Sequence, residues 1–168
     1  MRTSRALLIA FALLTPSAGL AAQQAPAKGA DLTGTWVINL AKSDLGTMPP
    51  PTIDSSTITR VGNVYEIAST SDFGGQGTQR QVLKWPVGEG EASNDLPNGA
   101  TIRSTTKVQH DTTTFSSTIS VQGQTVALQT GRTYLSPDGK TMTREMDIQP
   151  LAGPSTDPFH FRLVYDRK

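Results

Sequence analysis

The chain contains no cysteine. Disulfide bonds and thiolate metal sites are therefore excluded, and the fold must be held by burial and hydrogen bonding alone. The chain also has no large excess of charge of one sign, because 15 basic residues are balanced by 14 acidic ones. Clusters of lysine and arginine of the nucleic-acid-binding type are absent as well. We therefore do not expect nucleic acid as a partner.

Long apolar runs are scarce, and the first one lies at the start of the chain. Arg2 and Arg5 precede an unbroken apolar run over residues 6–14, and Pro16 and several small residues follow it. This order is typical of a secretory signal peptide. The run is about half of the roughly twenty residues that a membrane helix needs. No second apolar run of that length follows, so we expect no membrane span after cleavage.

These observations divide the chain into three parts. We expect a signal peptide over residues 1–21, with cleavage after Ala21 or after Ala22, and a flexible linker over residues 22–30. No cysteine stands at this junction, so we do not expect a lipoprotein-type anchor. Residues 31–168 are enough for one domain of ordinary size. The protein is expected in the periplasm or outside the cell.

Sustained helical spacing is absent from this domain, and the pattern has a period of two. Short β-branched runs alternate with Gly, Pro, Asn and Asp, which predicts about nine strands. They are expected over residues 36–40, 52–60, 64–70, 79–87, 100–109, 112–121, 124–135, 141–148 and 159–166. Turn signals at Gly62-Asn63 and at residues 136–139 predict hairpins. Residues 88–99 are polar and are expected to form a long loop with at most one short strand.

About nine sequential strands with short turns and no crossover helices predict an all-β, antiparallel up-and-down meander. Such a meander removes its exposed edges most simply by closing into a barrel. A two-sheet β-sandwich remains the alternative, because periodicity cannot distinguish closure from stacking.

Three segments carry a resemblance to a known group. They are the opening Gly34-Thr35-Trp36-Val37-Ile38-Asn39-Leu40-Ala41-Lys42-Ser43, the hairpin over residues 133–143 and the closing residues 163–168. Together they resemble bacterial exported proteins described as lipocalin-like β-barrels. The resemblance implies transport of a hydrophobic small molecule. The disulfide, and the helix that follows the barrel in typical lipocalins, have no counterpart here.

The resemblance also implies a structural role for the Gly-x-Trp opening. In lipocalins this tryptophan plugs the barrel floor and is covered by an arginine near the end of the last strand. Gly34 and Trp36 match the motif. Arg167 is the better match to the covering arginine, and Arg162 is the next. Alternatively, Trp36 is simply the largest core residue of the first strand.

Small hydroxyl side chains give a further indication about the interior. Ser117 alternates with Phe115 and Ile119 on one face of a predicted strand, and Ser104 and Thr106 interrupt the apolar face of the preceding one. If these faces point inward, they leave volume unfilled, which favours a barrel with a cavity. The alternative is an outer face carrying Ser and Thr for β-propensity and solubility.

Candidate ligand-binding residues are the large apolar side chains of these strands and two polar ones. The apolar candidates are Leu83, Trp85, Phe115, Ile119, Tyr134, Phe159 and Phe161. His160 and Arg162 lie on the strand face opposite Phe159 and Phe161. If that face lines the lumen, they would meet an anionic ligand or bind haem; the alternative is that they face solvent.

Catalytic patterns are missing. No Gly-x-Ser-x-Gly elbow is present, and neither histidine has a legible partner. We expect no metal site, and no cofactor apart from the remote option of haem at His160. The sequence favours a non-enzymatic exported protein that holds a small apolar or amphipathic molecule in its lumen. The alternative is a structural or protein-interaction module of the cell envelope without a ligand. The oligomeric state does not follow from the sequence.

Overall fold

The computed structural model describes residues 29–73, 75 and 77–168. The expected signal peptide, residues 1–21, and most of the expected linker, residues 22–30, lie outside this part. Gly29 and Ala30, the last linker residues, lie against the barrel: the Tyr65 hydroxyl donates to the carbonyl of Ala30 at 3.3 Å. No helix among the described residues is both long enough and apolar enough to cross a membrane.

The described part of the chain is built almost entirely of strands. They are β1 (Gly34–Ile38), β2 (Pro51–Val61), β3 (Val64–Phe73), β4 (Gln79–Pro86), β5 (Gly90–Asp95), β6 (Ala100–Gln109), β7 (Thr112–Val121), β8 (Gln124–Leu135), β9 (Thr141–Pro150) and β10 (Phe159–Arg167). A 3-10 helix, η1 (Leu40–Lys42), follows β1. Its N-cap is Asn39, whose side chain accepts a hydrogen bond from the backbone N–H of Lys42.

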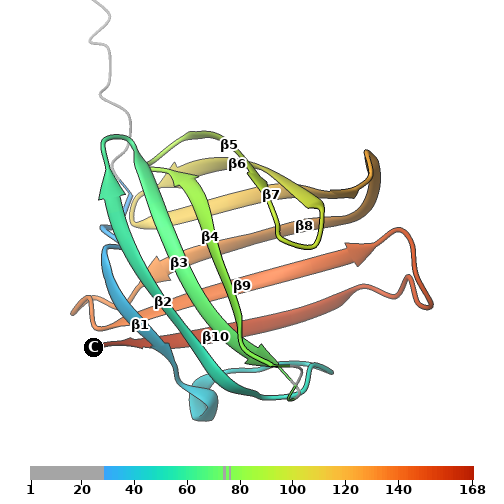
Figure 1. The fold of residues 1–168 in the computed structure, drawn as a ribbon. Coiled ribbons are helices and arrows are strands. Elements are labelled where there is room, and N and C mark those ends of the chain that lie inside the picture. The colour runs from blue at the N-terminus through green and yellow to red at the C-terminus, as the bar shows by residue number, and fades with distance from the viewer. Residues whose placement is uncertain (1–28, 74, 76) are drawn as a thin grey trace, which may run out of the picture.

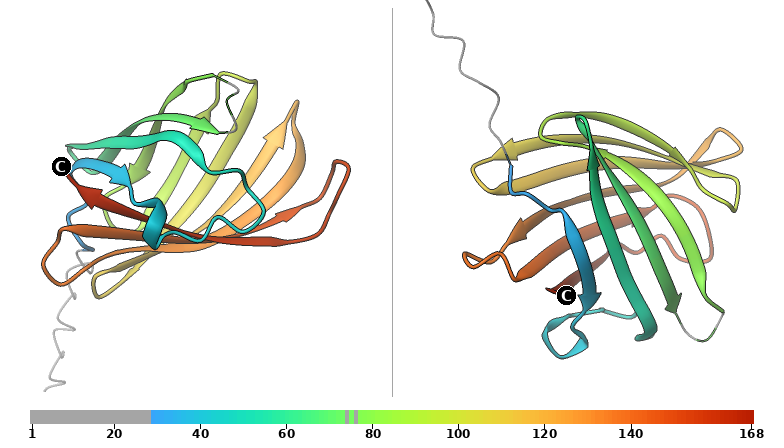
Figure 2. Two further views of the ribbon diagram at one scale, coloured as in Figure 1. Left: turned by 90° about the horizontal axis from the view of Figure 1, so that it is seen from below. Right: turned by 60° about the vertical axis from the view of Figure 1, so that its left-hand side comes forward.

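All ten strands belong to one antiparallel sheet in the order β4-β3-β2-β1-β10-β9-β8-β7-β6-β5. Each strand pairs with its neighbour in sequence, except that β1 pairs with β10 and the ladder is interrupted between β4 and β5. The sheet curls so that β1–β4 lie across from β6–β8 (Figures 1 and 2). The prediction of an antiparallel meander that closes into a barrel is confirmed, with a single curled sheet in place of the alternative two-sheet sandwich.

Among the described residues there is one strand more than the predicted nine, because residues 90–95 form β5. It is the one short strand that the expected loop over residues 88–99 allowed. The pattern did not fix its position, since Gly90-Glu91-Ala92-Ser93-Asn94-Asp95 has no alternating apolar residues. The strand exists because it pairs with β6 along its whole length, from Gly90 opposite Thr106 to Asp95 opposite Thr101. Pairing with a neighbour has overridden a weak local preference.

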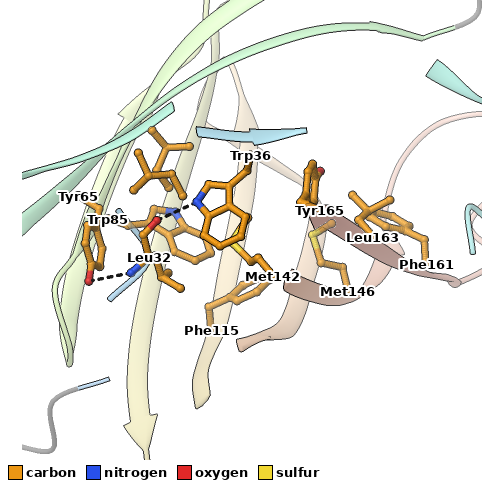
Figure 3. Packing of buried hydrophobic residues seen from close by; sticks show 12 residues of the cluster. Leu32, Trp36, Tyr65, Trp85, Phe115, Met142, Met146, Phe161, Leu163 and Tyr165 are labelled. Carbon is orange, nitrogen blue, oxygen red and sulfur yellow. Dashed lines mark hydrogen bonds between the residues drawn. The ribbon is translucent and has the colours of Figure 1, made fainter. Parts of the chain in front are cut away.

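Alternation along each strand sends one set of side chains into the barrel and the other to the outside. The inward set forms a core of Leu32, Trp36, Ile58, Tyr65, Ile67, Trp85, Phe115, Met142, Met146, Phe161, Leu163 and Tyr165. Figure 3 shows its labelled members converging from opposite walls. Burial is complete near Trp36, while Phe159 and Ile148, toward the other end of β10 and β9, are only partly buried. The barrel therefore has a closed end at Trp36 and a more open opposite end.

Candidate functional site

The closed end is built around Trp36, which is fully buried. Its indole N–H donates to the carbonyl of Leu32 at 2.9 Å, and the N–H of Leu32 donates to the Tyr65 hydroxyl at 3.4 Å (Figure 3). The segment before β1 thus folds back over the barrel end and is fixed there by hydrogen bonds. This arrangement seals that end of the barrel.

Arg167 covers the other side of this indole. Its guanidinium carbon lies 4.4 Å from the ring centroid, and its N–H groups donate to the carbonyls of Thr33 at 2.7 Å and Gly139 at 2.9 Å. Gly34 makes room for it: its φ is +129°, and a Cβ there would lie 3.0 Å from Arg167 Nη1. Gly34, Trp36 and Arg167 therefore form one structural unit, as in the role that the lipocalin resemblance implied for them.

Six of the apolar candidates face the interior. Trp85, Phe115 and Phe161 are buried in the core, and Leu83 and Phe159 pack partly buried against it. Ile119 is half-buried and shares the inward alternation of Phe115. The rings of Trp85 and Phe115 lie 5.0 Å apart at a tilt of 52° and join β4 to β7 across the lumen.

Tyr134, His160 and Arg162 lie on the outer face. For Tyr134 this differs from the expectation that it lines the lumen. For His160 and Arg162 the alternative, a position that faces solvent, describes the structure. The reason is strand parity, because their neighbours Thr133 and Phe161 point inward and are buried. The hydroxyl of Tyr134 donates to Glu145 at 3.0 Å. Nδ1 of His160 lies 2.9 Å from an Asp147 oxygen, and Arg162 donates to the carbonyl of Lys42 at 3.2 Å. A haem inside the barrel would not reach His160.

The lumen also contains a charged residue that the sequence analysis did not select. Arg144 stands at the middle of β9, on the inward face between Met142 and Met146. Its guanidinium carbon lies 4.3 Å from the ring centroid of Trp85 and 5.4 Å from that of Phe115. Its placement beside two aromatic faces is a favourable environment for a partly buried guanidinium.

Asp54 and Tyr165 form a second buried polar group in the lumen. The Tyr165 hydroxyl donates to an Asp54 oxygen at 3.0 Å, joining β10 to β2 across β1. Both side chains are buried. Among the ion pairs of the described residues, none joins Arg144 to a carboxylate. Asp54 thus balances the charge of Arg144 from a distance, without direct contact.

Burial sets the protonation of these three groups. It raises the pKa of Asp54 above its ordinary value, against the opposing effects of the Tyr165 hydrogen bond and the Arg144 charge. Burial also raises the pKa of Tyr165, and it lowers the pKa of Arg144, with Tyr165 and Asp54 opposing that decrease. Tyr165 therefore remains a protonated donor, while a charged Arg144 and a charged Asp54 both carry a desolvation cost.

The interruption between β4 and β5 is bridged by one side chain. Oδ1 of Asn94 accepts from the backbone N–H of Lys84 at 2.6 Å, and Nδ2 donates to the carbonyl of the same residue at 3.0 Å. The carboxamide thereby makes the two hydrogen bonds that the peptide group of a neighbouring strand would make.

Beyond this bridge lies a pocket of about 520 Å³, lined by Ala68, Ser69, Thr70, Arg80, Gln81, Val82, Asp95, Leu96 and Pro97. Ser69 and Gln81 in this lining belong to the inward strand face, and Ala68 and Val82 belong to the outward one.

The sheet, its curvature and its lined interior define an all-β, nearly closed antiparallel barrel with a buried polar centre. No family model and no curated protein matches this chain. Among solved structures, it is similar to one described as "REP1-NXSQ fatty acid transporter", with a TM-score of 0.51 and 11% sequence identity. The match covers 82% of this chain and 96% of that one. At this identity the similarity establishes a shared fold.

Proposed function

We propose that this protein is an exported, non-enzymatic binding protein of lipocalin-like type that holds a small apolar or amphipathic molecule in its barrel lumen. The observation that carries the proposal is the lining of a ten-stranded barrel by aromatic, methionine and small hydroxyl side chains. A barrel of eight strands is about wide enough to be filled by its own side chains or to hold one small ligand. Ten strands enclose more space.

The small inward side chains add to this space. Ser104 and Ser117 are buried on facing inward positions and lie 2.8 Å apart through their hydroxyls, and Thr106 donates to the carbonyl of Gly88 at 2.8 Å. Their hydrogen bonds are satisfied within the wall, so these residues do not need to reach into the lumen. A stretch of wall whose hydroxyl groups are hydrogen-bonded to other wall residues suits an apolar ligand chain.

The similar solved structure supports the same proposal, because its printed name is that of a fatty acid transporter. A fatty acid is amphipathic, and an amphipathic molecule suits an interior that combines an apolar wall with one guanidinium. The outer-face position of His160 makes haem the least favoured member of the ligand class.

Binding is tested directly with the purified domain, residues 29–168. Trp36 and Trp85 are the tryptophans of the chain, and Trp85 lies in the lumen, so ligands can be titrated by tryptophan fluorescence. The panel contains fatty acids, fatty alcohols, lysolipids and haem. We expect saturable one-to-one binding of at least one aliphatic amphiphile. A folded protein that binds none of the panel would overturn the proposal.

A matched pair of variants tests whether the ligand lies inside the barrel. Ile119→Trp adds volume on the inward face of β7, and Thr118→Trp adds the same side chain on the outward face of the same strand. Affinity should fall about tenfold or more for the first variant, which corresponds to about 1.4 kcal/mol, and stay unchanged for the second. Equal effects would place the ligand outside the lumen.

Export is tested separately from binding. Residues 1–30 fused to a reporter should direct it across the inner membrane of a bacterial host, and mass spectrometry of the exported fusion should find a start at Ala22 or Gln23. An uncleaved reporter that remains in the cytoplasm would overturn this part of the proposal.

A further inference from the structure

Two polar atoms in the lumen are buried and have no hydrogen-bond partner among the described residues. They are Nε of Arg144 and Oγ1 of Thr133. The two residues are register partners on β9 and β8, so both side chains point inward from adjacent positions. Buried polar groups without partners are costly, and two together indicate that a molecule completes their hydrogen bonds.

The surroundings restrict what this molecule can be. The rings of Trp85 and Phe115 lie beside the Arg144 guanidinium, so its hydrogen-bonding N–H groups are available mainly at its edge. The carboxylate of Asp54 is engaged by the Tyr165 hydroxyl and makes no ion pair with Arg144. Arg144 is partly buried, and its buried Nε has no partner among the described residues. Such a cation, with a hydroxyl donor beside it, fits a planar, acceptor-only anion.

We propose that Arg144 and Thr133 form the seat for the carboxylate head group of the ligand, which makes that ligand a long-chain aliphatic carboxylate. This inference rests on the proposed function and specifies its ligand class. Nε–H of Arg144 donates to one carboxylate oxygen, and the hydroxyl of Thr133 donates to the same oxygen or to the other. A fatty alcohol cannot compensate the charge, and a cationic amphiphile is repelled.

The position of the seat also sets the direction of the aliphatic chain. Along β9, Arg144 is followed on the inward face by Met146 and then by Ile148, which is only partly buried. On β10, Phe161 and Phe159 run beside them toward the same end. The carboxylate therefore lies at mid-barrel, and the chain extends along these apolar side chains toward the more open end.

The test compares ligands that differ only in the head group. Dodecanoate, dodecanol and dodecyltrimethylammonium are measured by calorimetry, below their micelle concentrations, at pH 8. We expect dodecanoate to bind about tenfold or more tightly than dodecanol, and the cation to bind most weakly. Equal affinity for dodecanoate and dodecanol would overturn the carboxylate seat while leaving the proposed function intact. Failure of all three to bind would overturn both.

Variants of Arg144 and Thr133 test whether these residues cause the preference for dodecanoate over dodecanol. Arg144→Gln should remove the preference for dodecanoate while dodecanol still binds, and Thr133→Val, which keeps the shape and loses the hydroxyl, should weaken dodecanoate alone by about threefold to tenfold. Arg132→Gln is the matched control, because Arg132 adjoins Thr133 in β8 but faces outward and pairs with Glu145. A loss of both ligands to the same extent in Arg144→Gln would contradict the seat.

A measurement on the wild-type protein avoids any folding defect of these variants. Dodecanoate labelled with ¹³C at its carboxyl carbon is titrated with acid while bound, and its chemical shift is followed. Beside Arg144 the bound carboxyl should remain ionised to a lower pH than the free ligand. A bound carboxyl that takes up its proton at a higher pH than the free ligand would place it in the apolar part of the lumen and overturn the proposal.

Discussion

The guanidinium of Arg167 lies over the indole of Trp36, with 4.4 Å between the guanidinium carbon and the ring centroid. The two residues are also register partners, because Trp36 in β1 stands opposite Arg167 in β10. The first and last strands are thus joined both by their backbones and by a stack of side chains. Gly34 permits this stack, since any side chain at its position would meet the guanidinium.

Replacing Arg167 by alanine should lower the free energy of unfolding by about 1 kcal/mol, because the stack on Trp36 is lost. Arg167→Lys should recover only part of this loss, since an ammonium lacks the planar edge that reaches Thr33 and Gly139. Urea unfolding measures both. Arg103→Ala, at an exposed position of β6, is the control and should change stability by less than about 0.5 kcal/mol. An Arg167→Ala variant as stable as the wild type would contradict the role of the stack.

The position of Gly131 has no room for a side chain. A Cβ at this position would overlap the carbonyl oxygen of Glu145 and would lie 2.6 Å from Cζ of Phe115. Gly131→Ala should therefore force β8 from β9 and displace the Phe115 ring, with a loss of about 1–3 kcal/mol in urea unfolding. Thr130→Ala, the preceding and exposed position, should have little effect. If Gly131→Ala proved neutral, the Phe115 ring would have to be free to move.

Asn94 should hold the barrel closed between β4 and β5. Asn94→Ala removes both hydrogen bonds to the backbone of Lys84, and we expect a loss of about 1–2 kcal/mol. Hydrogen exchange gives the more specific measurement: the amide of Lys84 should exchange much faster while the amides of β9 stay protected. Ser93→Ala, which changes an exposed side chain of the same strand, should alter neither. Unchanged protection of Lys84 in Asn94→Ala would show that the bridge does not close the gap.

Asp54 should make stability depend on pH in a direction that is unusual for an aspartate. Its pKa is raised in the folded state above the ordinary value of 3.8, so the folded protein binds the proton more tightly than the unfolded chain. This contribution to stability increases as pH falls through the raised pKa toward 3.8, and it is lost as pH rises.

Asp54→Asn imitates the protonated side chain and should raise the free energy of unfolding at pH 7, because the desolvation cost of the buried carboxylate is removed. The gain over the wild type should shrink as the pH is lowered through the folded-state pKa of Asp54. Asp111→Asn, in an exposed turn, is the control. A less stable Asp54→Asn variant at pH 7 would mean that the attraction between Asp54 and Arg144 outweighs the cost of burying the carboxylate.

Much of the fold follows from alternation in the sequence. The predicted ranges 112–121 and 124–135 coincide with β7 and β8, because a period of two and a glycine turn at Gly123 define them completely. For β5 the sequence allowed a short strand somewhere within residues 88–99 but did not define its position. Its residues are polar, and its strand conformation comes from pairing with β6 and from the use of Asn94 as a bridge.

The site was predictable only in part, and the reason differs from residue to residue. Arg144 alternates with the apolar Met142, Met146 and Ile148 in the sequence, so strand parity already placed a charge on the inward face. Asp54 offered no such signal. The register of β2 shifts between Pro51 and Ile53, just before Asp54. The hydrogen-bond partner of Asp54, Tyr165, lies 111 residues away in the sequence.

The interruption of the sheet lies between strands that are neighbours in the chain, while the first and last strands are hydrogen-bonded partners. The N–H of Lys168 donates to the carbonyl of Thr35 at 2.9 Å, so the two ends of the domain lie side by side. A circular permutant that joins residue 168 to residue 29 through a short linker, and begins at Gly88, would keep every strand pair of the sheet and the segment that seals the closed end. The pairing of β1 with β10 would then be local, and the permutant should refold faster than the natural order of strands, in which the chain must first bring its two ends together.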